Sequence, residues 1–294
     1  MNFPINPFHD LVAGYARLLQ PAADLNIATP SVSPVGPTGD GDNTVLIFAP
    51  HPDDESLTGA LALRLLRQRG MRVLVVPVTL GSRLDRRAER LSDLRDACAW
   101  LGFEVVDTGA DAFGTITPAV RENNRQVWSE AVEAAVAILS EHGPAVVCAP
   151  HLGDRHPAHV GTHRLVLDAL ASIPADFRCR LVETEYWAPM AEPNLMVESS
   201  IEDVADLVAA VSLHRGEVAR SPYHLSLPAW MIDNVRRGAE LIAGFHAEAP
   251  RFAFATLYRQ SLWCDCALQS PSGGTFLPAE ALPEGLSKEK GKSI

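Results

Sequence analysis

The sequence predicts a doubly wound α/β domain, in which helices cover both faces of a mostly parallel, Rossmann-like sheet. First, short runs that are apolar throughout alternate along the chain with stretches that have helical spacing. Strands buried on both faces give such continuous apolar runs, and strands that alternate with helices connect as parallel βαβ units. Second, 294 residues with 47% hydrophobic side chains are enough to bury a large core.

The elements are expected in the following order. Continuous apolar or β-branched runs predict strands at residues 44–49, 73–79, 104–107, 145–149 and 180–187. Apolar residues at intervals of three and four predict helices at residues 55–69, 84–101, 117–141, 159–171, 201–219 and 228–247. Gly102 follows the second of these helices, and glycine is the residue that most often ends a helix.

Three divisions of the chain follow from this pattern. Residues 1–43 combine a short amphipathic stretch with a segment rich in Pro, Gly, Ser and Asp, which predicts an N-terminal arm and linker. Residues 44–268 carry the alternating pattern and form the predicted domain. Residues 269–294 are rich in Pro, Gly, Ser and Lys and are expected to be a flexible C-terminal tail.

Composition limits the partners that the protein can have. The formal net charge is −11, and a broad surface that grips phosphates needs clustered cations, so a nucleic acid is not expected as partner. No apolar run approaches the roughly 20 residues that span a bilayer, and the start shows no export signal. The five scattered cysteines do not form a disulfide pattern, and a cytoplasmic location is expected. Association into a homo-oligomer is left open.

Directly after the first predicted strand, the chain reads His51-Pro-Asp-Asp-Glu at the start of a helix. Ligands of doubly wound sheets bind at the carboxyl ends of the strands. Three consecutive carboxylates repel one another unless a cation relieves them. His51 and Asp54 can face one metal ion across the turn, while Asp53 can reach a water molecule. The structural alternative is that one of the acids, most readily Glu55, caps the helix.

A second cluster follows the fourth predicted strand, where four histidines fall within thirteen residues: His151, His156, His159 and His163. Zinc suits imidazole and carboxylate ligands, and catalytic zinc sites generally have three protein ligands and an open position. Two ligands from the first cluster and one from the second satisfy that count, although spacing alone does not identify the third ligand. Each histidine taken singly has a solvated loop residue as its structural alternative.

Together, His51-Pro-Asp-Asp-Glu and the later His156-Pro-Ala-His159 resemble the PIG-L/LmbE family of zinc-dependent N-acetyl sugar deacetylases, over roughly residues 44–260. The resemblance implies a hydrolase that removes the N-acetyl group from an N-acetylated amino sugar, an N-acetylglucosamine-type conjugate, and releases acetate. It implies one Zn²⁺ per subunit, although Fe²⁺ suits the same ligands. By position it also implies that His51, Asp54 and His159 bind the metal, that Asp53 is the general base and that His156 stabilises the oxyanion.

Two further residues match the family more weakly. The resemblance implies that Arg90 contacts the substrate and that Asp107 binds sugar hydroxyls, with a surface cation and a strand-end cap as their alternatives. The sequence departs from the family at Ala158, where the family has Asp between the two histidines, and at Asp93, where it commonly has Glu. Asp154 is a substitute for the missing carboxylate, which would orient an imidazole of the site.

The predicted reaction is amide hydrolysis, with Asp53 taking a proton from water and a partly protonated His156 holding the oxyanion. This combination predicts a bell-shaped pH profile. Tyr186 and Trp187 can stack on a sugar ring or belong to the core. Two alternatives stay open, an amidase that cleaves a larger acyl or thiol-sugar conjugate and a non-catalytic sugar-binding or regulatory module. A nucleotide enzyme is disfavoured because carboxylates stand where a glycine-rich turn would bind pyrophosphate.

Overall fold

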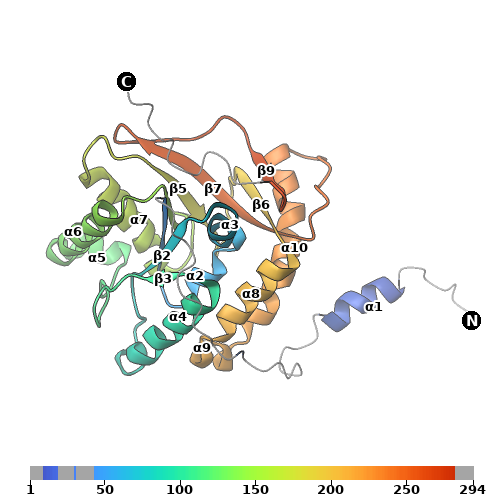
Figure 1. The fold of residues 1–294 in the computed structure, drawn as a ribbon, viewed down its shortest axis with the longest axis horizontal. Coiled ribbons are helices and arrows are strands. Elements are labelled where there is room, and N and C mark those ends of the chain that lie inside the picture. Colours follow the sequence, from blue (N-terminus) through green and yellow to red (C-terminus); the bar gives the residue numbers. More distant parts are fainter. Residues whose placement is uncertain (1–8, 19–29, 31–42, 282–294) are drawn as a thin grey trace, which may run out of the picture.

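A computed structural model describes residues 9–18, 30 and 43–281 of the chain (Figure 1). The central sheet has the strand order β3-β2-β1-β4-β5-β7-β6-β9, and β8 pairs with β7. The strands are β1 (Thr44–Ala49), β2 (Arg72–Pro77), β3 (Glu104–Val105), β4 (Val146–Pro150), β5 (Cys179–Thr184), β6 (Leu195–Ser199), β7 (Phe254–Cys264), β8 (Ala267–Gln269) and β9 (Thr275–Leu277).

The α-helices are α1 (His9–Leu18), α2 (Asp54–Leu57), α3 (Ala60–Arg69), α4 (Arg87–Leu101), α5 (Pro118–Asn123), α6 (Arg125–His142), α7 (Pro157–Ser172), α8 (Ile201–Ser212), α9 (Arg215–Arg220) and α10 (Leu227–Gly238). Two short 3₁₀ helices, η2 (Leu84–Arg86) and η3 (Tyr223–Ser226), precede α4 and α10. A single π-helical turn, η4 (Ala239–Ala243), extends α10.

The parallel half of the sheet is the predicted doubly wound fold. Strands β3, β2, β1, β4 and β5 all run in the same direction. The chain winds outward from β1 to β3 on one side and continues from β4 to β5 on the other. The strand order therefore reverses between β1 and β4, which is where a doubly wound sheet forms its ligand-binding crevice.

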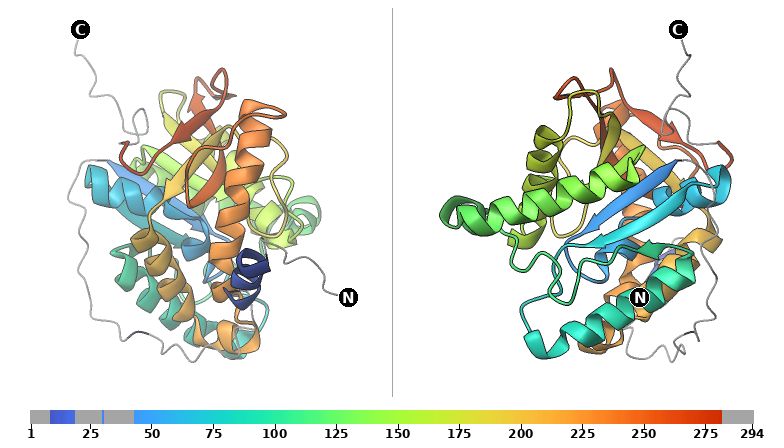
Figure 2. Two further views of the ribbon diagram at one scale, coloured as in Figure 1. Left: turned by 90° about the vertical axis from the view of Figure 1, so that its right-hand side faces the viewer. Right: turned by 60° about the vertical axis from the view of Figure 1, so that its left-hand side comes forward.

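Residues of β1 alternate between two cores, one on each face of the sheet. Val45 and Ile47 pack in the core that contains residues of α3, α4, α8 and α10. Leu46 and Phe48 pack in the core that contains residues of α6 and α7. All six residues of β1 are buried, which accounts for its continuous apolar run. Figure 2 shows α4 and α6 on opposite sides of the strands.

The sheet also has an antiparallel side that the sequence pattern did not indicate. Strand β7 pairs antiparallel with β5 and with β6, and β6 pairs with β9. The predicted helix at residues 55–69 is broken in two, because Gly59 has φ +82° and an added Cβ would lie 2.2 Å from the Thr256 side chain. The buried Tyr258 hydroxyl of β7 bridges the break by donating to the Thr58 carbonyl, 2.6 Å away.

Two more predicted helices are divided in the same way. The stretch at residues 117–141 forms α5 and α6, which meet at Asn124, and Asn124 caps α6 through Val127 N. The stretch at residues 201–219 forms α8 and α9, and His214 lies at the break. The break at His214 matters for the site, since its side chain contacts the first motif.

The expectation of a flexible tail at residues 269–294 is wrong for its first part. Strand β9 joins the sheet beside β6, and residues 278–281 are fixed by Arg64. Arg64 is only 1% exposed, and its guanidinium donates to the carbonyls of Leu277, Pro278, Ala279 and Ala281. A buried guanidinium needs acceptors, and these carbonyls supply them. Residues 282–294, and most of the predicted arm at 1–43 apart from α1, lie outside the described residues.

Two absences hold for the part of the chain that the structure describes. No helix there combines the length and the apolarity that crossing a bilayer requires. The structure describes all five cysteines, and no disulfide joins any two of them.

Candidate metal and catalytic site

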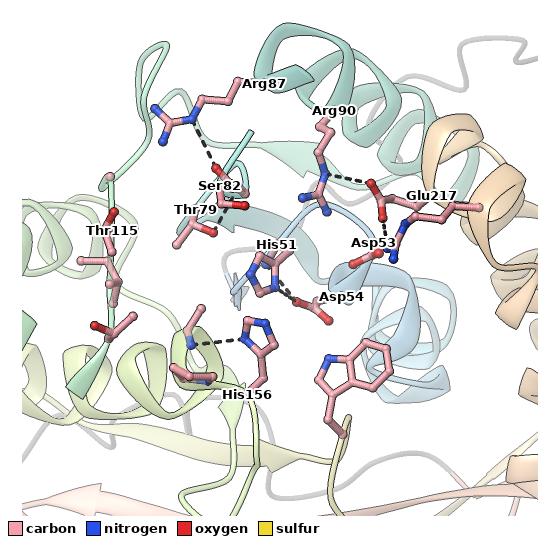
Figure 3. A pocket seen from close by; sticks show the side chains of 18 residues that line it. His51, Asp53, Asp54, Thr79, Ser82, Arg87, Arg90, Thr115, His156 and Glu217 are labelled. Atoms are coloured by element: carbon pink, nitrogen blue, oxygen red, sulfur yellow. Dashed lines mark hydrogen bonds and ion pairs between the residues drawn. The ribbon is translucent and has the colours of Figure 1, made fainter. Parts of the chain in front are cut away.

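The two motifs meet at the carboxyl ends of β1 and β4, the neighbouring strands at which the sheet reverses order. His51 and Asp54 come from the turn after β1 and the start of α2, while His156 and His159 come from the start of α7. One side-chain nitrogen from each of His51, His156 and His159 lies within 4.8 Å of the other two. Figure 3 shows His51, Asp54 and His156 directed toward one another at a cavity.

Asp54 lies at the centre of the cluster and is 1% exposed. Its Oδ2 is 3.3 Å from Nδ1 of His51 and 3.3 Å from Nε2 of His159, and it accepts the backbone N–H of His51 at 2.9 Å. Burial alone would raise the pKa of Asp54, but His159 and His51 outweigh it and lower that pKa far below the usual range. Asp54 is therefore a carboxylate at neutral pH and available as a ligand.

His159 is completely buried, and neither ring nitrogen has a hydrogen-bond partner among the described residues. Burial lowers its pKa, but the Asp54 and Asp154 carboxylates prevail and raise the pKa of His159 to about 10. The surroundings thus favour a positive charge at this imidazole. Because imidazole nitrogens and a carboxylate oxygen converge there in a buried cluster, His51, Asp54 and His159 fit a divalent metal such as zinc.

Ala158 has no carboxylate where the pattern described in the sequence analysis has an Asp, and Asp154 places a carboxylate beside His159 instead. Its Oδ2 lies 3.5 Å from Nδ1 of His159, and its Oδ1 accepts the backbone N–H of His156 at 2.7 Å. Metal-binding histidines generally direct their second nitrogen at a carboxylate or a carbonyl, which fixes the orientation of the ring. This contact matches the substitution that the sequence analysis suggested.

Asp53 occupies a strained turn, with φ 118° in a region that favours glycine. Its N–H donates to Oε2 of Glu55 at 2.8 Å, and its Oδ2 accepts the Tyr223 hydroxyl at 2.6 Å. Burial and then the charge of Asp54 raise the pKa of Asp53 to about 7. A carboxyl group with this pKa can both accept and return a proton near neutral pH.

The contacts that hold the Asp53 turn come from distant segments. Nε2 of His214 lies 2.8 Å from Oε1 of Glu55, and both side chains are buried. Arg90 donates to the carbonyl of Pro52 at 3.0 Å. Glu55 therefore holds the turn through the Asp53 backbone and is no simple helix cap, and His214 has a structural role as the partner of Glu55.

His156 lies against the cluster, with its ring centroid 4.8 Å from that of His51 and 5.1 Å from that of His159. Burial, followed by the charges of His51 and His159, lowers the pKa of His156. These surroundings favour the neutral imidazole over the partly protonated His156 that the sequence analysis expected. Its Nδ1 accepts the N–H of Ala158 at 3.3 Å, which assigns the ring proton to Nε2.

A cavity of about 490 Å³ opens beside the cluster, within the range of small-molecule sites. Arg90 lines it, and the contact of Arg90 with a substrate stays a prediction. Asp107 does not line it, and its Oδ1 accepts the N–H of Gly109, which is the strand-end role weighed as its alternative. The sequence analysis missed further polar lining residues, namely Thr79, Ser82, Arg87, Thr115, Thr117, Glu217 and Arg220.

Comparison with known proteins identifies relatives of this site. Residues 46–170, which hold both motifs, match the family described as GlcNAc-PI de-N-acetylase, PIG-L. A 1D-myo-inositol 2-acetamido-2-deoxy-alpha-D-glucopyranoside deacetylase from Mycobacterium leprae is 34% identical over an alignment of 155 residues, and the match covers 44% of this chain and 50% of that protein. The chain thus matches about half the length of this curated relative.

Solved structures share the fold at low sequence identity. The N,N'-diacetylchitobiose deacetylase from Pyrococcus horikoshii superposes with a TM-score of 0.54 at 16% identity, over 88% of this chain and 94% of that chain. The 4-carboxy-2-hydroxymuconate hydratase GalB from Pseudomonas putida superposes with a TM-score of 0.55, also at 16% identity, over 74% of this chain and 95% of that chain. Since a deacetylase and a hydratase share the fold, the reaction has to be inferred from the site.

Proposed function

We propose that the protein is a zinc-dependent N-deacetylase of the PIG-L family, because residues 46–170, which hold both motifs, match the model of that family. It would remove the acetyl group from an N-acetylated amino sugar of the N-acetylglucosamine type and release acetate. The observation that carries the proposal is the position of Asp53, a carboxyl group that lines a polar cavity next to the buried cluster of His51, Asp54 and His159. The cytoplasmic location stays a prediction.

His51, Asp54 and His159 would hold the metal ion. When bound, zinc would act as a Lewis acid that polarises the acetamide carbonyl and lowers the pKa of water in the site. The Asp154 carboxylate, 3.5 Å from Nδ1 of His159, would fix the orientation of that ligand. This contact favours catalysis over the alternative of a non-catalytic module, because it places a carboxylate beside the metal-binding imidazole although Ala158 has none.

Asp53 would accept a proton from the attacking water. Its Oδ2 is engaged by the Tyr223 hydroxyl, which leaves Oδ1 as the oxygen that takes up the proton. The same carboxyl group would then return the proton to the leaving nitrogen, so that the amide C–N bond breaks and a free amine and acetate result. A pKa near 7 suits both transfers.

His156 would stabilise the negative oxygen that develops on the acetamide carbonyl. With Nδ1 accepting the Ala158 N–H, the neutral ring has an N–H donor at Nε2. Hydrogen-bond donation by this group does not need a protonated imidazole, and such fixed donors stabilise developing charge effectively. The polar lining of the cavity, with Arg90 and Glu217 among its residues, would bind the sugar hydroxyls.

The test is product analysis with the zinc-loaded protein and a panel of N-acetylglucosamine conjugates that includes the inositol glycoside. We expect acetate and free amine in equal amounts. Release of neither product from any conjugate would contradict the proposal. Release of amine from larger N-acyl groups only would instead identify the amidase alternative.

The matched variant is Asp53→Asn, which retains the shape of the side chain but removes its basicity. We expect kcat to fall by about 10²- to 10⁴-fold, the usual contribution of a general base. Because Asp53 is not a proposed ligand, the variant should bind as much zinc as the unaltered protein. Retention of near-full turnover would show that Asp53 is not the base.

A further inference from the structure

A second cavity of about 160 Å³ adjoins the polar one. Trp187 lines both cavities, so the two are neighbours at the same end of the sheet. The second cavity differs in character, since its walls are predominantly apolar and aromatic. They include Leu57, Tyr186, Trp187, Tyr223, Leu227 and Trp230. The proposed deacetylation uses none of these ring faces.

Two of the aromatic walls are fixed to the catalytic turn by their hydroxyl groups. The Tyr223 hydroxyl donates to Oδ2 of Asp53 at 2.6 Å, and the Tyr186 hydroxyl donates to the carbonyl of Asp54 at 3.4 Å. The Tyr186 ring also packs edge-on against His159, with 4.9 Å between ring centroids. These two rings of the second cavity are therefore held in place beside the catalytic turn.

Trp187 presents a large apolar surface where the two cavities meet. The residue is 61% exposed, although its backbone N–H is anchored to Oδ2 of Asp154 at 3.1 Å. Exposed aromatic rings beside a ligand site generally mark a surface that a ligand covers. The acidic group nearby, Glu185, is not free to bind a polar ligand, because it pairs with Arg237 at 2.8 Å.

We propose that the second cavity is the subsite for an apolar, ring-sized group that the substrate carries next to its N-acetylated sugar. This inference rests on the proposed function. A cavity of about 150 Å³ with apolar walls holds one benzene molecule, so the volume matches a single aromatic ring. Four aromatic walls further favour an aryl group, which can stack on one ring and meet another edge-on. The substrate class is thus an aryl glycoside of N-acetylglucosamine, in contrast to the polar inositol glycoside named for the relative.

The experiment compares the phenyl and methyl glycosides of N-acetylglucosamine, in both anomers, together with the inositol glycoside. We expect kcat/KM for the better phenyl anomer to exceed that for the matching methyl glycoside by about tenfold. This is the gain from removing roughly 60 Å² of apolar surface from water. Equal values for the phenyl and methyl glycosides, or a preference for the inositol glycoside, would overturn the proposal.

A variant that fills the cavity tests its location. Ser226 is exposed, lines the second cavity and makes no side-chain cap bond at the start of α10, so Ser226→Phe adds a ring without removing a structural contact. We expect this variant to lose the preference for the phenyl glycoside. Ser129→Phe, at an exposed position on α6 away from both cavities, is the matched control and should keep it. A preference that survives Ser226→Phe would contradict the assignment.

Calorimetric binding separates this inference from the proposed function. Dissociation constants for the phenyl and methyl glycosides are measured with the same three proteins, independently of turnover. If no glycoside is deacetylated but the phenyl glycoside binds about tenfold more tightly and Ser226→Phe removes the difference, the subsite stands and the proposed reaction fails. If acetate is released but the two glycosides bind equally, the reaction stands and the subsite fails.

Discussion

Two clusters of charged side chains in this molecule are built in opposite ways. In the first, Asp168 of α7 accepts two hydrogen bonds from Arg121 of α5, at 2.8 and 3.0 Å, and one from Trp128 of α6, at 2.8 Å. Burial alone would raise the pKa of Asp168, but these partners outweigh it and lower the pKa. Each charge in this three-helix cluster is matched, and its effect is to join α5, α6 and α7.

In the second cluster, at the ends of β1 and β4, like charges are crowded together, and the contacts between opposite charges are longer, at 3.3 to 3.5 Å. Two adjacent carboxyl groups share the turn, Asp53 has φ 118°, and both ring nitrogens of His159 lack hydrogen-bond partners. Strained backbone and unsatisfied buried groups persist only where the surrounding structure enforces them, and they concentrate at functional sites. The contrast indicates that the first cluster stabilises the fold, whereas the second is arranged for a cation and a substrate that the fold alone does not supply.

Removal of the metal ion should have the largest effect on turnover, and it should act through the second cluster and not through the first. Treatment with a strong chelator should abolish acetate release, and zinc should restore it. Magnesium should not, because it prefers oxygen ligands. The melting temperature should also rise with added zinc, since a ligand that binds only the folded state stabilises it. Full turnover after chelation would show that the crowded charges at the ends of β1 and β4 do not serve to hold a catalytic metal ion.

The variant Tyr223→Phe tests whether the Asp53 turn is held for catalysis. It removes the hydroxyl that donates to Oδ2 of Asp53 but retains the ring that lines the second cavity. We expect kcat to fall by about 10- to 100-fold, the worth of one hydrogen bond to a charged group, with KM nearly unchanged. The preference for the phenyl glycoside should remain. A change in KM alone, with kcat intact, would assign Tyr223 to binding and not to positioning.

The variant Asp168→Asn should have the smallest effect and should act on stability only. We expect a loss of about 1 kcal/mol in the free energy of unfolding, a modest value because Arg121 is partly exposed, and no change in turnover. A carboxyl group whose pKa is lowered by folding stabilises the protein above its unfolded pKa of about 3.9 and loses that contribution as the pH falls through the folded value. In urea unfolding, the difference in stability between variant and parent should therefore be full at pH 7 and decrease as the pH falls below about 3.9.

The sequence was sufficient to predict the parallel half of the fold and to indicate that the two motifs lie close together. Strands that are buried on both faces have continuous apolar runs, which can be recognised in the sequence without knowledge of distant contacts. The motif residues follow directly after two such strands, β1 and β4. Adjacent strands then bring His51, Asp54, His156 and His159 together without further information. Asp107 follows a strand but does not line the cavity, because the end of a strand does not determine where an exposed side chain points.

The rest could not be predicted because it depends on contacts between distant segments. Tyr223 reaches Asp53 across 170 positions, and His214 reaches Glu55 across 159. Both lie near helix ends, where nothing in the local pattern marks a catalytic partner. The antiparallel strand β7 and the ordered residues 275–281 depend likewise on long-range pairing with β5 and β6 and on the buried guanidinium of Arg64.

The most direct test of the central claim is the metal content of the purified protein after dialysis against zinc, measured by inductively coupled plasma mass spectrometry. The unaltered protein, Asp54→Asn and His159→Gln are compared, with circular dichroism to verify that all three are folded. The account predicts one zinc ion per chain in the unaltered protein and a marked loss in both folded variants. A protein without bound metal, or variants that retain the full complement, would contradict it.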